Sequence, residues 1–343
     1  MSKKVFAFFS SDAREKYKSD IFRTLALPHK YVIHFRYQTK YIQPKLLSNL
    51  NTLLNKEGVI FYANGNDTNK DKDKREITFL SIRNVIIKDI YRDDTLDLVN
   101  FYLELSDFVD CKFIENTPKE LVTPNFSVSE IEIDSGQKNK WGERVNLLQN
   151  YLKNTLYYFI NSVRQGNTEL EPKYSKLAKE SFYELNDESD YQIYFSVFDP
   201  SNGEYGLEVK NSGDTFDIDI PYEHKVAAPR DTELFVLHTH TLQVLSKSEV
   251  TTYSIRSSSP TVAPTPMIDL SVKLHWKIIK KFWNIVLFGI FSIIAAIGLA
   301  LAALASTDLS KTSFTMLNIA LAVISALLIG FAASLLFWMF NKQ

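Results

Sequence analysis

Alternating hydrophobic and polar positions predict that the first third of the chain is rich in β-strands. The clearest alternation lies in residues 31–42, where aromatic and aliphatic side chains alternate with His34, Arg36, Gln38 and Lys40. Because successive side chains of a strand point to opposite faces, this pattern predicts a strand with one buried face and one basic, solvated face. Shorter patterns predict a helix near residues 44–55 and further strands at residues 5–9, 58–62, 77–91 and 96–108.

The basic face of that strand is a candidate binding surface. Contact with phosphate groups needs clustered bases, so His34, Arg36 and Lys40 are candidate residues for binding nucleic acid or an acidic protein partner. An ordinary solvated sheet face explains the same pattern, because the aromatic residues lie on the opposite face instead of alternating with the bases. Both interpretations stay open.

The middle of the chain predicts helices followed by strands. Apolar residues between 145 and 163 recur at helical spacing, which predicts a helix over residues 141–165, and a shorter helix is predicted at residues 174–185. Strands are then predicted at residues 191–198, 205–209, 215–220 and 233–245. With residues 1–125 as a mixed α/β module and residues 126–256 as a second module, the predicted fold class is α+β.

Two long apolar stretches near the C-terminus predict a transmembrane helical hairpin over residues 282–343. Residues 282–305 and 314–340 contain no formal charge, and each is long enough to cross a hydrocarbon core of about 30 Å. A proline-rich linker and a basic interfacial segment, residues 257–281, precede the hairpin.

The charges beside the hairpin predict its orientation. Lysines before the first span place both ends of the chain in the cytoplasm of a two-span inner-membrane protein, with the lipid bilayer as a partner. The predicted residues of the membrane interface are Lys273, Trp276, Lys277, Lys280, Lys281, Trp283 and Trp338. Small residues recur along both spans, which suits close helix packing and predicts a homo-oligomer.

Composition and motifs exclude several classes of protein. The chain has 343 residues with 45% hydrophobic and 23% charged residues, which excludes a disordered or collagen-like protein. A single cysteine excludes an intramolecular disulfide and a cysteine-based zinc site. No P-loop or GxGxxG motif occurs, so nucleotide hydrolysis by a P-loop is not expected.

One histidine pair suggests metal chemistry. His238 and His240 lie two apart in a predicted strand and therefore point to the same face, where they are suited to bind one ion. Ser246 and Glu249 follow, and the segment resembles the motif of JAMM (JAB/MPN) metallopeptidases, in which an upstream glutamate precedes His-x-His-Pro, a serine and an aspartate.

The resemblance, which covers residues 174–255 at most, implies a role for each matching residue. His238, His240 and Glu249 would be zinc ligands, Ser246 would support the oxyanion, and Glu188 would act as the base. The sequence departs from the motif because Thr241 replaces the proline, Glu249 replaces the aspartate, and the spacing to the serine is two residues short. An accidental pair of solvated histidines explains the same residues, and in that case no cofactor is expected.

Two functional hypotheses follow from the sequence. The first is a non-enzymatic membrane sensor, effector or adaptor that acts through oligomerisation and binds a protein partner. Its layout of cytoplasmic modules followed by two spans resembles bacterial two-helix membrane effectors of antiviral defence and stress signalling. The alternative is a membrane-tethered, zinc-dependent peptidase or isopeptidase that uses the histidine pair.

Overall fold

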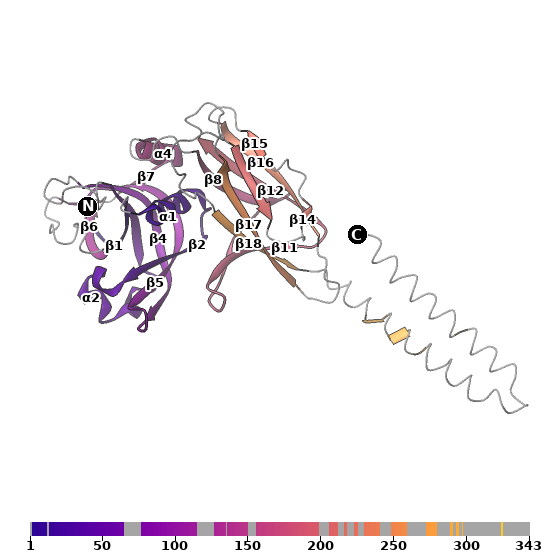
Figure 1. The fold of residues 1–343 in the computed structure, drawn as a ribbon, viewed down its shortest axis with the longest axis horizontal. Helices are drawn as coiled ribbons and strands as arrows, with labels where there is room; N and C mark the ends of the chain where they lie inside the picture. The colour runs from indigo at the N-terminus through magenta and orange to yellow at the C-terminus, as the bar shows by residue number, and fades with distance from the viewer. Residues whose placement is uncertain are drawn as a thin grey trace, which may run out of the picture. The chain divides into compact units, whose positions relative to one another are not determined.

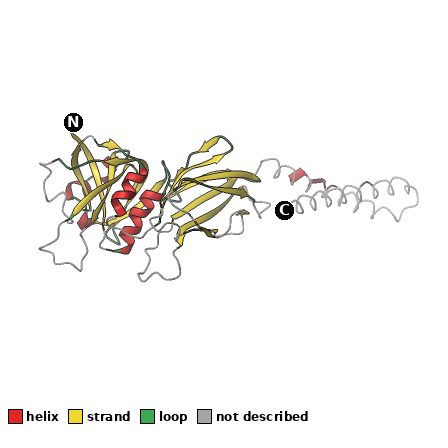
Figure 2. Cartoon of the chain, turned by 90° about the horizontal axis from the view of Figure 1, so that it is seen from above, coloured by secondary structure: helices red, strands yellow, loops and turns green. Residues whose placement is uncertain are grey.

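The computed structural model describes most of the chain up to residue 279. The described residues are 2–11, 14–64, 77–114, 127–134, 136–149, 156–198, 206–211, 216–217, 223–225, 230–240, 248–258 and 272–279, with isolated positions at 289–290, 293–294, 297 and 324. Residues 1–240 and 250–278 form one compact unit. Strands prevail over helices throughout the described part of this unit (Figure 2).

The N-terminal part of the compact unit is built on a curled seven-stranded sheet (Figure 1). Its path is β2-β5-β4-β3-β1-β6, with β7 paired to β5, and an isolated bridge from Ile42 to Val128 brings the chain after β2 back to β6. The strands are β1 Ser2–Ser11, β2 Val32–Gln38, β3 Glu57–Asn64, β4 Thr78–Asp93, β5 Leu98–Asp110, β6 Val128–Asp134 and β7 Gln137–Lys138. The helices are α1 Glu15–Ala26, α2 Pro44–Leu47 and α4 Trp141–Gln149, with 3₁₀ turns at Thr39–Tyr41 and Leu50–Leu53.

Two further sheets form a β-sandwich in the second part of the unit. One sheet has the order β14-β16-β12-β8-β9 and the other the order β10-β11-β18-β17-β13-β15. The first contains β8 Tyr157–Gln165, β9 Thr168–Leu170, β12 Ser189–Phe198, β14 Phe216–Asp217 and β16 Arg230–Thr239. The second contains β10 Lys173–Ser175, β11 Glu180–Asn186, β13 Gly206–Asn211, β15 Glu223–Lys225, β17 Ser248–Ser258 and β18 Val272–Ile279.

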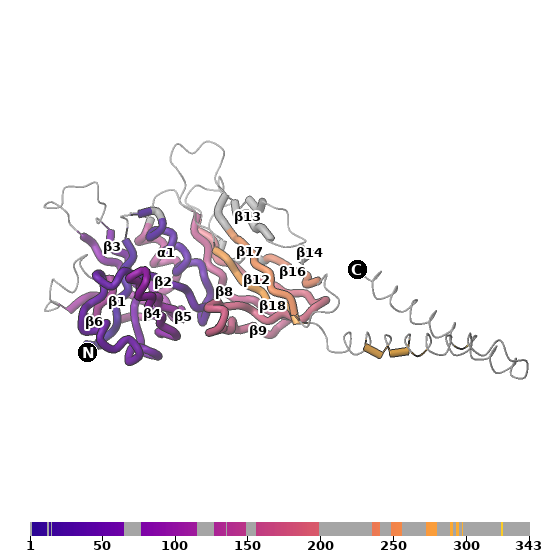
Figure 3. The backbone as a smooth tube through the Cα atoms, turned by 60° about the horizontal axis from the view of Figure 1, so that its bottom comes forward, coloured from indigo at the N-terminus to yellow at the C-terminus, as the bar shows by residue number. Residues whose placement is uncertain are grey.

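Aromatic side chains join the two sheets of the sandwich. The hydroxyl of Tyr158 in β8 donates a hydrogen bond of 2.7 Å to the carbonyl of Ile255 in β17. Trp276 of β18 is fully buried and stacks on Tyr183 of β11 with 5.4 Å between ring centroids. β17 and β18 run side by side, so β18 is an interior strand of its sheet (Figure 3).

Helix α1 connects the seven-stranded sheet to the sandwich. Its apolar face is formed by Ile21, Phe22 and Leu25, all at most 1% exposed, and Phe22 lies 5.2 Å from the ring of Tyr158 in β8. The helix ends at Ala26 before Pro28, which lacks the N–H that a longer helix would need. This packing fixes the position of α1 against β8 of the sandwich.

A buried arginine donates hydrogen bonds to carbonyl groups at the C-terminal end of α1. Arg83 of β4 is fully buried, and its Nη1 donates to the carbonyls of Thr24 at 2.9 Å and Leu27 at 2.6 Å. Its Nε donates to the carbonyl of Ser106 at 2.6 Å, and the guanidinium lies 4.5 Å from the ring centroid of Phe108. Burial lowers the pKa of Arg83 to about 9, so the group remains charged near neutral pH.

The buried arginine affects the neighbouring His29. Burial and the positive charge of Arg83 lower the pKa of His29 from 6.5 to about 4, against the opposing effect of Asp107. The unfolded chain therefore takes up this proton near pH 6.5, whereas the folded chain takes it up near pH 4. Protonation of His29 favours unfolding between these two values.

We expect this histidine to contribute to a loss of stability in acid. As the pH falls from about 6.5 to about 4, the unfolding temperature of the wild-type protein should fall more steeply than that of His29→Gln. Thermal unfolding followed by circular dichroism over this range would measure the difference between the two curves. Parallel curves across the whole range would contradict the assignment.

The predicted α+β class is wrong, because the described residues form three sheets with few helices. The helix predicted at residues 141–165 is α4 at its start, but residues 157–165 form β8, which is buried on both faces for most of its length. The helix predicted at residues 174–185 is instead the end of β10, a turn and most of β11. The strands predicted within residues 1–110 correspond to β1 to β5, but the strand predicted at residues 31–42 ends at Gln38 and is followed by a 3₁₀ turn.

The predicted membrane hairpin is also corrected. Residues 282–305 and 314–340 lie almost wholly outside the described residues. Within the part of the chain that the structure describes, none of the helices combines the length and the apolar character needed to cross a membrane. This finding overturns the predicted two-span inner-membrane protein and the prediction of a membrane effector that depended on it.

Candidate functional site

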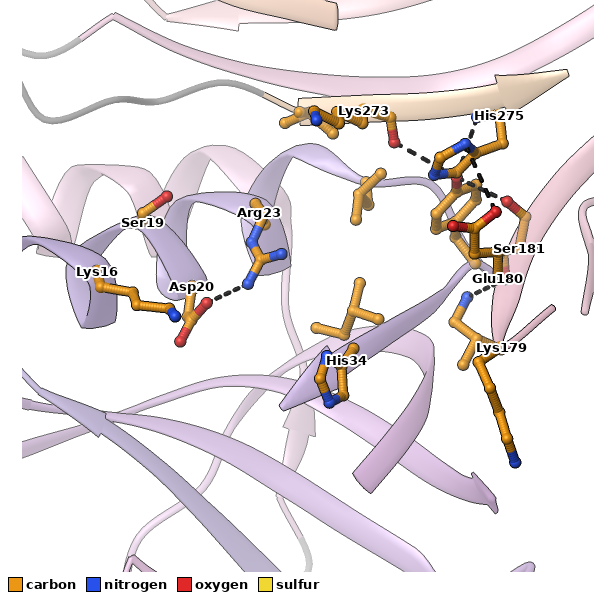
Figure 4. A pocket seen from close by; sticks show the side chains of 15 residues that line it. Lys16, Ser19, Asp20, Arg23, His34, Lys179, Glu180, Ser181, Lys273 and His275 are labelled. Carbon is orange, nitrogen blue, oxygen red and sulfur yellow. Dashed lines mark hydrogen bonds and ion pairs between the residues drawn. The ribbon is translucent and has the colours of Figure 1, made fainter. Parts of the chain in front are cut away.

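A cleft of about 380 Å³ lies where α1 and β2 meet β11 and β18 (Figure 4). Helix α1 contributes Lys16, Ser19, Asp20 and Arg23, which recur at helical spacing and so lie along one face of the helix. Figure 4 shows these side chains on one side, Glu180, Ser181 and His275 on the other, and His34 between them. The apolar lining consists of Leu27, Tyr31, Ile33 and Val272.

Tyr31 forms hydrogen bonds to both β11 and β18 at the cleft. Its hydroxyl donates to the carbonyl of Ser181 in β11 at 3.0 Å and accepts the backbone N–H of His275 in β18 at 3.4 Å. The backbone N–H of Val32 donates to the hydroxyl of Ser181 at 2.8 Å. Complete burial raises the pKa of Tyr31, so the phenol stays neutral and continues to donate. These hydrogen bonds hold β2, β11 and β18 together, so the walls of the cleft have fixed positions within the compact unit.

The carboxylates of the cleft already have partners. Asp20 is paired with Arg23 one turn later in α1, and burial raises its pKa although Arg23 opposes this. Glu180 lies 3.9 Å from Nδ1 of His275. The pairing with Arg23 leaves Asp20 less available to attract a cation, whereas Glu180 keeps its negative charge because His275 is mainly neutral at pH 7.

The lysines of the cleft differ in whether they form an ion pair. Lys179 is paired with Asp89 of β4, and Figure 4 shows its side chain directed away from the other lining residues. Lys16 and Lys273 are exposed and form no ion pair with any described residue. The cleft therefore presents two ammonium groups outside ion pairs, one from α1 and one from β18, and the charge of Lys16 also opposes the rise that burial causes in the pKa of Asp20.

Two histidines add hydrogen-bonding groups to the walls. His34 stacks on Tyr102 with 4.9 Å between ring centroids, and its Nε2 lies 2.8 Å from Oδ1 of Asn100. Nδ1 of His275 lies 3.0 Å from the hydroxyl of Thr252. Partial burial lowers the pKa of both histidines, so both are mainly neutral at pH 7.

Only part of the predicted basic surface belongs to this cleft. His34, Arg36 and Lys40 are exposed, and the alternation of β2 predicted that exposure. His34 lines the cleft, whereas Arg36 and Lys40 do not. The predicted binding of nucleic acid or an acidic partner at this surface stays a prediction.

The residues matched to the metallopeptidase motif are only partly brought together. His238 points outward from β16, and its Nδ1 lies 2.7 Å from Oδ1 of Asp190. Glu188 is exposed in the turn between β11 and β12, and Glu249 is 8% exposed in β17, a strand of the other sheet.

These positions do not form a described metal site. Ser246 lies outside the described residues, and His240 is half-buried at the end of β16. Among the residues that the structure describes, no three histidine, cysteine, aspartate or glutamate side chains are grouped closely enough to hold a metal ion. The zinc-peptidase interpretation therefore rests on the sequence alone.

The predicted interfacial residues have other positions. Trp276 is fully buried in the sandwich, Lys273 lines the cleft, and Lys277 lies 3.8 Å from Glu184 of β11. The strand β18 alternates buried and outward positions, which places its lysines on one face and Trp276 on the other. The remaining predicted residues, Lys280, Lys281, Trp283 and Trp338, lie outside the described residues.

Sequence reasoning did not find the cleft, because four separate segments form it. The signal that was present is the period-two pattern of residues 272–279, which places Lys273 and His275 on the same face of a strand.

Comparisons with known proteins do not assign this chain to a family. No family description matches it, and no curated protein matches its sequence. Similar solved structures include WR4, a C. elegans MSP family member, at 13% identity over 29% of this chain and 92% of that one, with a TM-score of 0.19. Another is a chimeric titin Z1Z2-Z1Z2 tandem functionalized with a GRGDS peptide from fibronectin, at 7% identity over 75% of this chain and 94% of that one, with a TM-score of 0.16.

Proposed function

We propose that this chain is a ligand-binding protein of the sensor or adaptor class and that the cleft is its binding site. The observation that carries the proposal is that both parts of the compact unit form the cleft: α1 and β2 from the N-terminal part, and β11 and β18 from the sandwich. A ligand in this position contacts both parts at once. Binding therefore stabilises their packing against each other, and this provides a physical basis for a sensor.

The volume of the cleft supports a small ligand. Sites for small molecules commonly have about 300–1,000 Å³, and the cleft has about 380 Å³. Its lining combines apolar side chains with a few polar groups, the mixture that holds and orients an organic molecule. Homo-oligomerisation and a protein partner stay predictions from the sequence.

A thermal-shift screen of small metabolites tests this function with the full chain. A compound that binds only the folded state should raise the unfolding temperature by roughly 2–3 °C at ten times its Kd. Ser19→Trp, which introduces a large ring on the cleft face of α1, should remove at least half of that shift. Lys18→Trp adds the same ring to α1 at a residue that does not line the cleft, and should retain the shift.

Two results would contradict the proposal. Compounds that stabilise the wild type and both variants equally would place the binding site elsewhere. A broad screen in which no compound stabilises the wild-type protein would count against a ligand-binding cleft altogether.

A further inference from the structure

The charges of the cleft identify the class of ligand, and this step rests on the function proposed above. Asp20 is paired with Arg23, Glu180 lies near His275, and Lys179 is paired with Asp89. His275 is mainly neutral at pH 7, so Glu180 keeps its negative charge, and the cleft has one excess positive charge. The cationic donors without an ion pair in the described structure are Lys16 and Lys273, one on each wall. We infer that the cleft binds a small organic dianion, specifically a phosphate monoester.

The arrangement of donors favours a phosphate group. Lys16, Ser19 and Arg23 lie along the same face of α1, and Lys273 approaches from β18 on a different wall (Figure 4). One phosphate carries nearly two charges and three acceptor oxygens on a single tetrahedral centre, so donors from both walls can contact it together. Only one Nη of Arg23 is engaged with Asp20, and the rest of the guanidinium fork is left for a phosphate oxygen.

The apolar lining indicates that the phosphate carries an organic group. Leu27, Tyr31, Ile33 and Val272 form part of the wall, where they are packed in the core and at most 5% exposed. An apolar body placed against them adds van der Waals contact and the burial of a small nonpolar surface to the charge interaction. A phosphate monoester with a small apolar body therefore matches both kinds of lining.

The cleft also excludes a large anionic partner. A cavity of about 380 Å³ accommodates a small molecule, whereas a specific protein interface buries about 800 Å² on each partner. The acidic side chains Asp20 and Glu180 also line the wall and disfavour a run of many negative charges. A single compact dianion meets the two open lysines with less of this repulsion.

Phenyl phosphate is a suitable probe, and isothermal titration calorimetry of the full chain at pH 7.5 measures its binding. We expect phenyl phosphate to bind about tenfold more tightly than benzoate, which has one charge, and more tightly than inorganic phosphate, which lacks the ring. Lys16→Gln and Lys273→Gln should each weaken the binding of phenyl phosphate by about five- to tenfold. The matched control is Lys176→Gln, an exposed lysine in the turn before β11 that does not line the cleft, and it should change the affinity less than about twofold.

The outcomes separate this inference from the proposed function. Equal binding of benzoate and phenyl phosphate, or full affinity in Lys273→Gln, would overturn the dianion assignment. If phenyl phosphate does not bind but a neutral compound does, and Ser19→Trp blocks that compound, the ligand class is wrong and the proposed site stands. If Ser19→Trp leaves the binding of phenyl phosphate unchanged, both the ligand class and the site fail. Lys16 and Lys273 are exposed, so the unliganded variants should unfold at the wild-type temperature.

Discussion

Replacing Trp276 with alanine should lower the free energy of unfolding by about 3–5 kcal/mol, because large-to-small changes of a buried aromatic remove its packing and leave a cavity. The indole is fully buried between Tyr183 and Tyr253, with ring centroids 5.4 Å and 5.9 Å away. Urea unfolding followed by circular dichroism measures this loss. Trp276→Phe keeps part of the packing and should cost about half as much.

A matched control lies on the same strand. Lys273→Ala removes an outward side chain of β18 and should change the free energy of unfolding by less than about 0.5 kcal/mol. A loss below about 1 kcal/mol in Trp276→Ala would contradict the placement of β18 inside the sandwich. That result would instead support the interfacial position predicted from the sequence.

Arg83→Ala is expected to be the second strongly destabilising change, by about 3–5 kcal/mol. The substitution leaves the carbonyls of Thr24, Leu27 and Ser106 without the donor that the guanidinium supplies. Arg83→Met fills more of the space and removes the buried charge, so it should cost about 1–3 kcal/mol less than alanine. The exposed Arg92→Ala in the same strand should stay within about 0.5 kcal/mol of the wild type.

The arginine variants also test the link between the core and the cleft. Arg83 contacts the end of α1, and α1 carries Lys16, Ser19 and Arg23 into the cleft. We therefore expect Arg83→Met to weaken ligand binding even at a temperature where the protein remains folded. Chemical unfolding and calorimetry with phenyl phosphate measure the two effects separately. A destabilised variant with unchanged affinity would show that α1 is held by its apolar face alone.

The strands of the N-terminal sheet were predictable because one of their faces is more polar than the other. β2 shows the pattern most clearly: its buried and exposed residues alternate along the strand as the sequence indicates. β8 lacks such a signal. Its residues are buried on both faces for most of its length, and a short apolar run of this kind does not distinguish a strand from a helix.

The pattern of residues 272–279 indicates a strand, but the residues around it suggested a membrane interface. The alternation of residues 272–279 is that of a strand, with Val272, Leu274, Trp276 and Ile278 buried. The lysines between them are followed by a long apolar stretch, and the same composition is typical of a membrane interface. The cleft was beyond prediction for another reason. Its walls come from the consecutive elements α1 and β2 and from β11 and β18 much later in the chain, and only the tertiary fold brings them together.

The hydroxyl of Tyr31 binds two residues that come much later in the sequence. Ser181 in β11 follows it by 150 residues, and His275 in β18 follows it by 244 residues. During synthesis, the first of these partners leaves the ribosome long before the second. A nascent chain that ends before His275 therefore has α1 and β2 but lacks one wall of the cleft. The proposed ligand would therefore bind only after β18 has joined its sheet, and shorter translation intermediates would stay unbound.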